Sequence, residues 1–401
     1  MRILVLNSGS SSQKACLYEI SGAPPKNPPP YLWQAKIEWS DSGADVRIGA
    51  GHAVRFQQRV SSGSRKEITE KVLGDLWKGS PALVPGPSAI DVVGHRIVHG
   101  GEKFSAPAVV TPEVKDAIRR ASEFAPLHNP AGLEGIEIIE QILGSVPQVA
   151  VFDTGFHRHI PEAAATYPGP HEWLSRGIRR YGFHGINHQY CSERAAEMLG
   201  REEKSLKLVT CHLGNGCSLA AIRGGRSIDT TMGFTPLDGL MMGTRSGSID
   251  PGIVTYLMRQ DRLDAKAIDD LLNKESGLAG ISGISNDMRE IVSALKQGNA
   301  RAKLAFDIFI HRLVSLIGSM FAVLGGADAL VFTAGIGENS ADVRAATCAH
   351  FEFVGLKLDS AKNSKPSADG DLSAPASRVR TLVIHAEEDW SIARSCCEML
   401  S

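Results

Sequence analysis

The chain lacks an excess of charge of either sign and is poor in aromatic residues. Its 401 residues include 43 Lys and Arg against 44 Asp and Glu, which leaves a net charge of −1, and aromatics make up 6%. We therefore expect no basic surface for a nucleic acid or an anionic membrane. Hydrophobic residues reach 43%, which excludes a disordered chain, and at ~100–200 residues per domain the length predicts two domains.

Cysteine is scarce and its spacing is not that of a disulfide or zinc framework. The seven cysteines include no C-x-x-C pair, and the adjacent Cys396 and Cys397 are poorly placed to bond to each other. This usage predicts reduced thiols and a cytoplasmic protein. The apolar run at the N-terminus, Ile3–Leu6, is too short for a signal sequence, and we expect no membrane-spanning segment.

Short apolar runs alternate with helical patterns, which predicts an α/β protein with buried sheets. Residues 3–20 and 207–222 repeat one pattern: an apolar strand, a small polar turn and a returning apolar strand. The repeat predicts two related domains, and chance similarity of two hairpins is the alternative. The proline-rich segment 23–30 reads as a surface loop, and residues 31–87 are weakly patterned apart from a helical signal at Glu67–Trp77.

Three glycine-rich segments follow apolar strands, at Asn7–Ser12, His212–Gly216 and Gly335–Asn339. Backbone N–H groups in such turns can surround an anion, and glycine lets phosphate oxygens come close, so together they favour a phosphate site. Each turn could also merely close a hairpin. Walker and Rossmann glycine patterns are absent from the sequence, which disfavours both of those modes of nucleotide binding.

Arg96 and Arg245 each lie among glycines and other small residues. A guanidinium in such surroundings suits two-point binding of a carboxylate or phosphate, although a structural arginine that binds loop carbonyls would look the same.

Histidines and acids complete the candidates. His157 with His159, and His184 with His188, have spacings that suggest zinc, but no H-E-x-x-H pattern accompanies them and glycines beside His184 favour a loop. We favour His184 as a donor to an anion, and His128 as a fixed polar group or a base. Asp153 ends a buried strand, where α/β sheets place functional groups.

Glu387 and Glu388 follow the last predicted strand. They suit Mg²⁺ bound to nucleotide phosphates, which needs one or two carboxylates. Their alternative role is to place negative charge at a helix N-terminus.

Ten motifs occur together and in one order along the chain: Leu6–Lys14, Gly94–Gly101, Leu127–Pro130, Phe152–His157, Arg179–Gly185, His212–Gly216, Met232–Leu237, Met241–Gly247, Asn286–Arg289 and Gly335–Asn339. This combination resembles the acetokinase family of short-chain carboxylate kinases. The resemblance implies two duplicated actin-like ATPase domains, as in sugar kinases, heat-shock chaperones and actin, with nucleotide in the cleft between them, and a homodimer. The implied domains are residues 1–150, joined by a C-terminal helix at 386–401, and residues 151–385.

The resemblance also implies the reaction, which is reversible, Mg²⁺-dependent, direct in-line transfer of a phosphoryl group from ATP to acetate, giving ADP and acetyl phosphate. Mn²⁺ could replace Mg²⁺. Catalytic roles fall to Asp153, His184, Arg245, Arg96 and His128, and the metal ligands are Asn7 and Glu387. Acetate would contact Arg96, Val98, Leu127, Phe183 and Pro236. ATP would contact Ser10, Ser12, Lys14, His212, Leu213, Gly214, Asn215, Gly216, Asp287, Met288, Arg289, Gly335, Ile336, Gly337, Glu338 and Asn339.

Elementary chemistry is consistent with these roles. A small carboxylic acid is ionised at pH 7, so the nucleophile needs no base, and the site must supply cations to the transferring phosphoryl group. Asp153 is then expected to orient Arg245 or a metal-bound water.

The sequence departs from the family at Ser248, where Asp is usual, and at His385–Ala386, which leaves Glu387 and Glu388 both open as the metal ligand. A propionate or butyrate kinase is the alternative function, and a non-metabolic actin-like ATPase is the alternative from another class.

Overall fold

The computed structural model describes residues 1–9, 12–40, 43–50, 53–61, 63–126 and 128–400. The chain forms two compact units: unit 1 contains Met1–Gly155 and Glu387–Ser401, and unit 2 contains Phe156–Ala386. Unit 1 is therefore built from both ends of the chain, and unit 2 is inserted between them. The sequence-based boundaries lay at residues 150 and 385.

Unit 1 contains a mixed sheet in the order β5-β4-β3-β2-β1-β6-β8-β7. Its strands are β1 (Arg2–Ser8), β2 (Ser12–Glu19), β3 (Trp33–Ser40), β4 (Gly43–Ala50), β5 (Ala53–Val60), β6 (Val92–Ile97), β7 (Ala108–Val109) and β8 (Gln148–Phe152). β1 pairs antiparallel with β2 and parallel with β6, and β6 pairs parallel with β8. The carboxyl ends of β1, β6 and β8 therefore lie at the same edge of the sheet.

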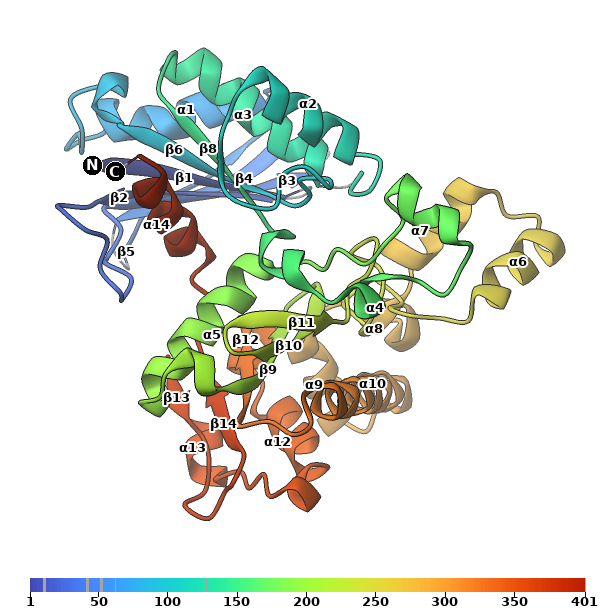
Figure 1. Cartoon of the computed structure of the whole chain (residues 1–401). Coiled ribbons are helices and arrows are strands. Elements are labelled where there is room, and N and C mark those ends of the chain that lie inside the picture. Colours follow the sequence, from blue (N-terminus) through green and yellow to red (C-terminus); the bar gives the residue numbers. More distant parts are fainter. Residues whose placement is uncertain (10–11, 41–42, 51–52, 62, 127, 401) are drawn as a thin grey trace. The chain divides into compact units, whose positions relative to one another are not determined.

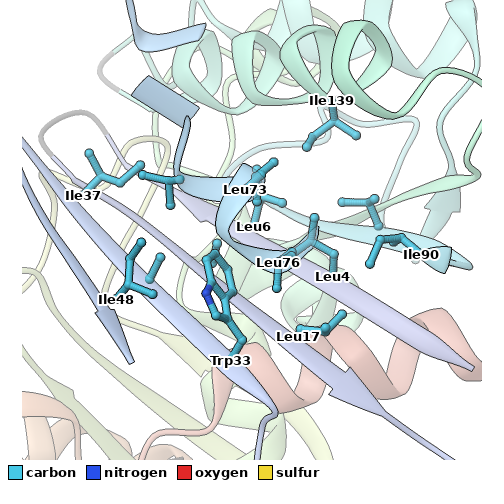
Figure 2. Close-up of a cluster of buried hydrophobic side chains, with 14 of the residues drawn as sticks. Leu4, Leu6, Leu17, Trp33, Ile37, Ile48, Leu73, Leu76, Ile90 and Ile139 are labelled. Carbon is cyan, nitrogen blue, oxygen red and sulfur yellow. The ribbon is translucent and has the colours of Figure 1, made fainter. Parts of the chain in front are cut away.

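One face of this sheet packs against α1 (Arg65–Lys78) and α3 (Asn129–Leu143), and α2 (Pro112–Ala121) lies beside α3 (Figure 1). Figure 2 shows the resulting core, in which Leu4 and Leu6 of β1 meet Leu73 and Leu76 of α1 around Trp33. All five side chains are fully buried. Burying one such side chain contributes about 1.5–3 kcal/mol, so this cluster stabilises the central strand β1 in the sheet.

The C-terminal helix α14 (Glu388–Leu400) packs against β1 and β6 of the same sheet. Gly94 of β6 permits this close packing, because a Cβ there would lie 2.6 Å from Ile392 Cγ2 and 2.7 Å from Cys396 Sγ. The helix thereby brings its first residues to the sheet edge where β1 ends.

Unit 2 repeats the central part of this arrangement in the order β11-β10-β9-β12-β14-β13. Its strands are β9 (Lys207–Leu213), β10 (Cys217–Arg223), β11 (Arg226–Thr230), β12 (Ala329–Thr333), β13 (Gly370–Asp371) and β14 (Arg380–Val383). β9 pairs antiparallel with β10 and parallel with β12, as β1 does with β2 and β6. The duplication predicted from residues 3–20 and 207–222 is confirmed.

The described helices of unit 2 are α4 (Glu162–Ala165), α5 (Gly185–Leu199), α6 (Pro251–Gln260), α7 (Ala265–Lys274), α8 (Gly277–Ser282), α9 (Met288–Lys296), α10 (Ala300–Leu324), α11 (Ala334–Asn339), α12 (Ala341–Ala349) and α13 (Ser360–Ser364). Short 3-10 turns lie at Pro87–Ala89, Gly155–His159, His171–Arg176, Glu203–Ser205 and Glu352–Val354. α10 packs on α8, α9 and β10. By length and composition it is apolar enough to cross a membrane, a test that a buried core helix also passes, and 39% of its most apolar stretch is buried.

Two sequence-based assignments are corrected, and two segments gain structure that the sequence left open. Residues 31–87, weakly patterned in the sequence, contain three strands, β3 to β5. His184 lies in the loop that its glycines predict, and His188 lies inside helix α5. Gly335–Asn339 forms helix α11 and not a turn. Arg96 lies within strand β6, whereas the apolar run Ile90–Gly94 predicts a position just after the strand. In each case tertiary pairing outweighed the glycine signal or the weak alternation on which the prediction depended.

Candidate active site

In unit 1, polar side chains gather at the carboxyl edge of the sheet. Asn7 is near the end of β1, Arg96 is in β6, and Asp153 directly follows β8. Because these strands are parallel and in register, their ends bring the three side chains together. Glu388 joins them from the first turn of α14.

Arg96 forms a buried two-point ion pair with Asp153. Arg96 Nη2 donates to Asp153 Oδ2 at 2.5 Å, and Nε donates to Oδ1 at 3.2 Å. The Asp153 side chain is only 1% exposed. Burial alone would lower the pKa of Arg96, but the charges of Asp153 and Glu388 outweigh it and raise that pKa above its ordinary value. Arg96 is thus a fixed cation whose plane is set by Asp153.

A second group of contacts joins Asn7 to two acids of α14. Asn7 Nδ2 donates to Glu388 Oε2 at 3.2 Å and to Asp389 Oδ1 at 3.3 Å, while Asn7 Oδ1 accepts from Arg96 Nη1 at 3.3 Å. Burial, and then the charge of Glu388, raises the pKa of Asp389. The predicted ligand Glu387 lies just before the helix, and its backbone carbonyl accepts from the Ser391 N–H. Lys14 lies opposite Asn7 on β2.

In unit 2, His184 occupies the residue before helix α5. Its backbone has φ +57° and ψ +24°, in the left-handed region that costs a non-glycine residue about 1 kcal/mol or more. His157 Nε2 donates to the carbonyl of the preceding residue, Phe183, at 3.1 Å. Burial lowers the pKa of His157 to about 4, so His157 is a neutral imidazole that helps to hold this turn.

The His184 ring is held from two sides. Its face stacks on the ring of His212, with centroids 3.9 Å apart and planes within 8°. Its Nδ1 lies 2.9 Å from Ser218 Oγ, and Ser218 Oγ also lies 2.7 Å from His188 Nε2. These contacts leave the opposite edge of the His184 ring, with Nε2, facing Gly216.

The Arg245 guanidinium also lies next to Gly216. A Cβ at Gly216 would lie 3.5 Å from Arg245 Nη1 and 3.5 Å from His184 Nε2, so the two donors converge on one point. Arg245 Nη1 also donates to the carbonyl of Pro236 at 3.3 Å. Burial lowers the pKa of Arg245, and the Cys217 sulfur only partly offsets this. A bound anion would therefore stabilise the charged guanidinium.

A pocket of about 750 Å³ adjoins the β9–β10 turn in unit 2. Its lining residues come from that turn, the start of α9, α11 and the start of α12: Gly214, Asn215, Asn286, Asp287, Met288, Arg289, Val292, Gly335, Ile336, Asn339, Ser340 and Asp342. Eight of these were among the predicted ATP contacts. Three sequence-distant segments thus meet at one cavity large enough for a nucleotide.

The pocket wall is held by polar contacts. Arg289 pairs with Asp287 at 2.5 Å and lowers the pKa of that carboxyl, and Asn286 Nδ2 donates to Asn215 Oδ1 at 3.2 Å. Glu338, another predicted contact, accepts instead from His385 Nδ1 at 2.6 Å.

The remaining predicted residues are spread over both units. His128 is the residue before α3, Val98 is buried directly after β6, and Ser12 begins β2. Phe183 is buried and Pro236 lies in the loop after β11. Ser10 and Leu127 lie outside the described residues. Leu213 ends β9, and Gly337 lies in α11.

Zinc is not indicated by the histidines. Within the described ranges, no group of three or more His, Cys, Asp or Glu side chains could hold a metal ion. The histidines bind hydroxyls and carbonyls instead: His157 Nδ1 lies 2.8 Å from Ser227 Oγ, and His188 Nδ1 lies 2.7 Å from Thr210 Oγ1.

Sequence reasoning missed Asp389, Ser218 and Thr210. The signal for Asp389 was present, since it follows Glu388 in the same first turn. Ser218 and Thr210 lie inside buried strands, and no pattern marks a buried hydroxyl as the partner of a particular histidine.

Comparison with known proteins assigns the family. Residues 2–394 match the acetokinase family. The acetate kinase of Gloeobacter violaceus is 56% identical, with 100% of both chains covered, and that of Cyanothece sp. is 55% identical, covering 100% of this chain and 98% of the other.

Solved structures agree over the whole length. Porphyromonas gingivalis acetate kinase superposes with a TM-score of 0.89 at 40% identity, covering 100% of both chains. A propionate kinase from Francisella tularensis gives 0.90 at 39% identity, covering 98% of each. The two units have the duplicated actin-like ATPase fold of these kinases. The chain therefore belongs to the acetokinase family.

Proposed function

We propose that this protein is a kinase that transfers the γ-phosphoryl group of ATP reversibly to acetate, giving ADP and acetyl phosphate. The observation that carries the proposal is the convergence of His184 Nε2 and Arg245 Nη1 at Gly216, in the turn that also lines the 750 Å³ pocket. Two donors next to a nucleotide-sized cavity suit the charge of a transferring phosphoryl group.

Acetate would bind to Arg96. A carboxyl of this kind has a pKa of about 4.3, so acetate is already ionised at pH 7. Its carboxylate can therefore attack phosphorus without a base. Asp153 then serves to orient the Arg96 guanidinium, since both of its oxygens accept from Arg96. In-line positioning of two bound substrates supplies much of the remaining rate enhancement.

The acids at the start of α14 fit a divalent cation. Glu388 and Asp389 offer carboxylate oxygens beside the Asn7 amide, and these are ligands that Mg²⁺ prefers. Burial, and then the charge of Glu388, raises the pKa of Asp389, and a bound cation would favour its charged carboxylate. We assign Mg²⁺ to these residues, with Mn²⁺ as a substitute. When bound, the ion neutralises phosphate oxygens of the nucleotide.

Acetate and propionate are the two candidate substrates. Val98, Phe183 and Pro236 are the apolar residues assigned to the methyl group, and a branched Val98 favours the shortest acid. Propionate is the second candidate, favoured by the close superposition with a propionate kinase. One methylene is worth only ~1–3 kcal/mol in such a pocket, so we expect a preference and not exclusion.

The test is ADP formation by the purified protein with Mg²⁺ and acetate, propionate or butyrate in turn. We expect the largest kcat/KM with acetate. Arg245→Ala should lower kcat by at least ~10² while both KM values change only a few-fold, because its contact forms with the transition state. ADP formation that does not depend on any short carboxylate would reject the proposal and favour a non-metabolic ATPase.

We further propose a homodimer formed through unit 2. None of the ten residues of α6 is buried, and Ile253, Tyr256 and Met258 are 43–56% exposed. Leu304 of α10 and Ile281 of α8 are also exposed apolar residues. Covering such side chains with a second copy would remove apolar surface from water.

Light scattering coupled to size exclusion would measure the assembly. Tyr256→Glu is expected to give a folded monomer, whereas Phe353→Glu, at an 80% exposed apolar residue on the turn Glu352–Val354, should leave the mass unchanged. Equal masses for both variants and the parent would contradict this interface.

We place the protein in the cytoplasm, since its seven cysteines are buried thiols that form no disulfide in the described residues and would stay reduced there. Cell fractionation tests this placement.

A further inference from the structure

The His184 imidazole ends a line of four hydrogen-bonding groups. Thr210 Oγ1 lies 2.7 Å from His188 Nδ1, His188 Nε2 lies 2.7 Å from Ser218 Oγ, and Ser218 Oγ lies 2.9 Å from His184 Nδ1. Thr210, His188 and Ser218 are fully buried. The first three groups therefore meet at short distance and away from solvent, and the His184 ring at the end of the line is partly exposed.

Two arrangements of protons run in one direction along the whole line while both imidazoles are neutral. A hydroxyl donates one proton, and a neutral imidazole donates from one nitrogen and accepts at the other. In the first arrangement Thr210 donates to His188 Nδ1, His188 Nε2 donates to Ser218, Ser218 donates to His184 Nδ1, and the proton of His184 is on Nε2. In the reverse direction, His184 donates from Nδ1 and its Nε2 is bare.

Burial, and then the neighbouring His157 and His212, lower the pKa of His188 far below its ordinary value. His188 is therefore neutral, as the counting assumes. The titratable or charged groups around His184 in the described part of unit 2 include His188 through Ser218, His212 on the ring face and Arg245 across Gly216. The permanent charge of Arg245 disfavours a second cation at His184.

We propose that Thr210, His188 and Ser218 are positioning residues that hold His184 as the neutral tautomer with its proton on Nε2. That nitrogen faces the point beside Gly216 at which Arg245 Nη1 also arrives. A bare Nε2 there would turn a lone pair toward an anion, whereas Nε2–H donates to it. Hydrogen bonds that run in one direction polarise one another, so the line strengthens the last donor.

The inference deepens the proposed function and rests on it for its catalytic meaning, but not for its test. In the proposed reaction, His184 would stabilise a phosphoryl oxygen as an uncharged donor, and no proton would be transferred. The kcat would then stay constant across the pH range in which free histidine titrates, which is centred on about 6.5.

Nitrogen-15 NMR of the substrate-free protein tests the tautomer directly, because protonated and bare ring nitrogens resonate far apart. The His184 signals are assigned by their loss in His184→Gln. At pH 7 we expect a protonated Nε2 and a bare Nδ1. A bare Nε2, or both nitrogens protonated at pH 7, would overturn the proposal.

Matched variants test the line of donors. Thr210→Val keeps the shape but removes the first donor, so the His184 proton should redistribute toward Nδ1, while Thr210→Ser should keep the parent signals. Ser373→Ala removes a similarly buried hydroxyl, which accepts from the Thr381 N–H, and should leave His184 unchanged. If Thr210→Val, folded as judged by its thermal midpoint, keeps the parent tautomer, Thr210 has no positioning role and the proposal fails.

Kinetics gives a second, separate readout. Ser218→Ala should lower kcat by about 10²-fold with KM nearly unchanged, as loss of one oriented donor does. Its residual kcat should rise as pH falls, since protonation of both ring nitrogens would restore Nε2–H. A pH-independent kcat in this variant would contradict the proposal. Absence of acetate-dependent activity in the parent would reject the proposed function, whereas the NMR result would decide the tautomer independently.

Discussion

Gly216 shows how one absent methyl group can matter to a site. A Cβ there would make only ordinary contacts of 3.4–3.5 Å with His184 and Arg245, so Gly216→Ala should fold normally. The methyl group would nevertheless occupy the space where an oxygen must approach both donors. We expect kcat to fall at least ~10-fold, since an oriented donor is worth 10²–10³.

Steady-state kinetics and thermal denaturation of Gly216→Ala would be measured together. Gly318→Ala is the matched control: its Cβ would meet nothing within 4 Å inside α10, and it should raise stability by about 0.5–1 kcal/mol without changing kcat. Full activity in Gly216→Ala would show that no reacting oxygen comes near Gly216.

Asp153 allows a sharp distinction between an orienting role and a base. Asp153→Asn keeps the shape but removes the charge that holds Arg96, which should raise KM for acetate by ~10-fold or more, because a charged hydrogen bond is worth about 1.5–3 kcal/mol. The dependence of kcat on pH should not change. A loss of kcat below about pH 6–7 in the parent that disappears in the variant would instead identify Asp153 as a base.

At this scale the sequence singles out individual side chains but does not specify how they are paired. Arg96 and Asp153 were both singled out, but their ion pair depends on β6 and β8 lying side by side, which a sequence pattern does not specify. The sequence could not predict the hydrogen bonds of Ser218 for the same reason, since its partners His188 and His184 are 30 and 34 residues away.

At the scale of elements, helix α11 depends on one buried arginine. Arg344 of α12 donates to the carbonyls of Gly337 and Glu338 at 2.8 and 2.7 Å and to Asn363 Oδ1 at 2.8 Å, and the side chain is 1% exposed. Arg344 thus ties the end of α11, which lines the 750 Å³ pocket, to the following helices.

Arg344→Lys should loosen α11, because an ammonium cannot span these acceptors with the geometry of a guanidinium. We expect KM for ATP to rise several-fold, with KM for acetate nearly unchanged and a lower thermal midpoint. Arg312→Lys, on α10 and exposed, is the control. An equal rise in both KM values would mean that the change spreads beyond the nucleotide pocket.

Long periodic elements were predictable and short or paired ones were not. The sequence pattern predicts helices at Pro251–Arg259, Ala265–Asn273 and Ala302–Leu324. The helices α6, α7 and α10 begin and end within two residues of these ranges. The strands β3 to β5 pair chiefly with one another and with β2, so their residues are stabilised by cross-strand neighbours and not by any local signal. Helix α11 was hidden by two glycines that usually mark a turn.

At the scale of the molecule, buried neutral histidines make both units sensitive to acid. Burial lowers the pKa of His95, His99 and His157 to about 4, and that of His188 further. In the unfolded state the pKa of histidine is about 6.5. Between the folded pKa of about 4 and this value, the unfolded state therefore binds more protons than the folded state. Stability therefore falls as pH falls from about 6.5 to 4, by up to about 1.4 kcal/mol per pH unit and histidine.

Thermal unfolding at several pH values would measure this slope. The glutamine of His95→Gln is neutral at every pH, so this variant should lower the slope of stability against pH by the contribution of one histidine. His350→Gln, at an exposed position, should change the slope little. A midpoint that stays constant between pH 6.5 and 4.5 would contradict the expectation.

The insertion of unit 2 between the two parts of unit 1 has a consequence for synthesis on the ribosome. At ~5–20 residues per second, the strands of unit 1 wait on the order of ten seconds or more before α14 emerges. Until then the faces of β1 and β6 that α14 covers, including Gly94, have no partner helix. The nascent chain therefore presents an incomplete sheet for the whole time that unit 2 is translated, and chaperone binding during translation should concentrate on that sheet.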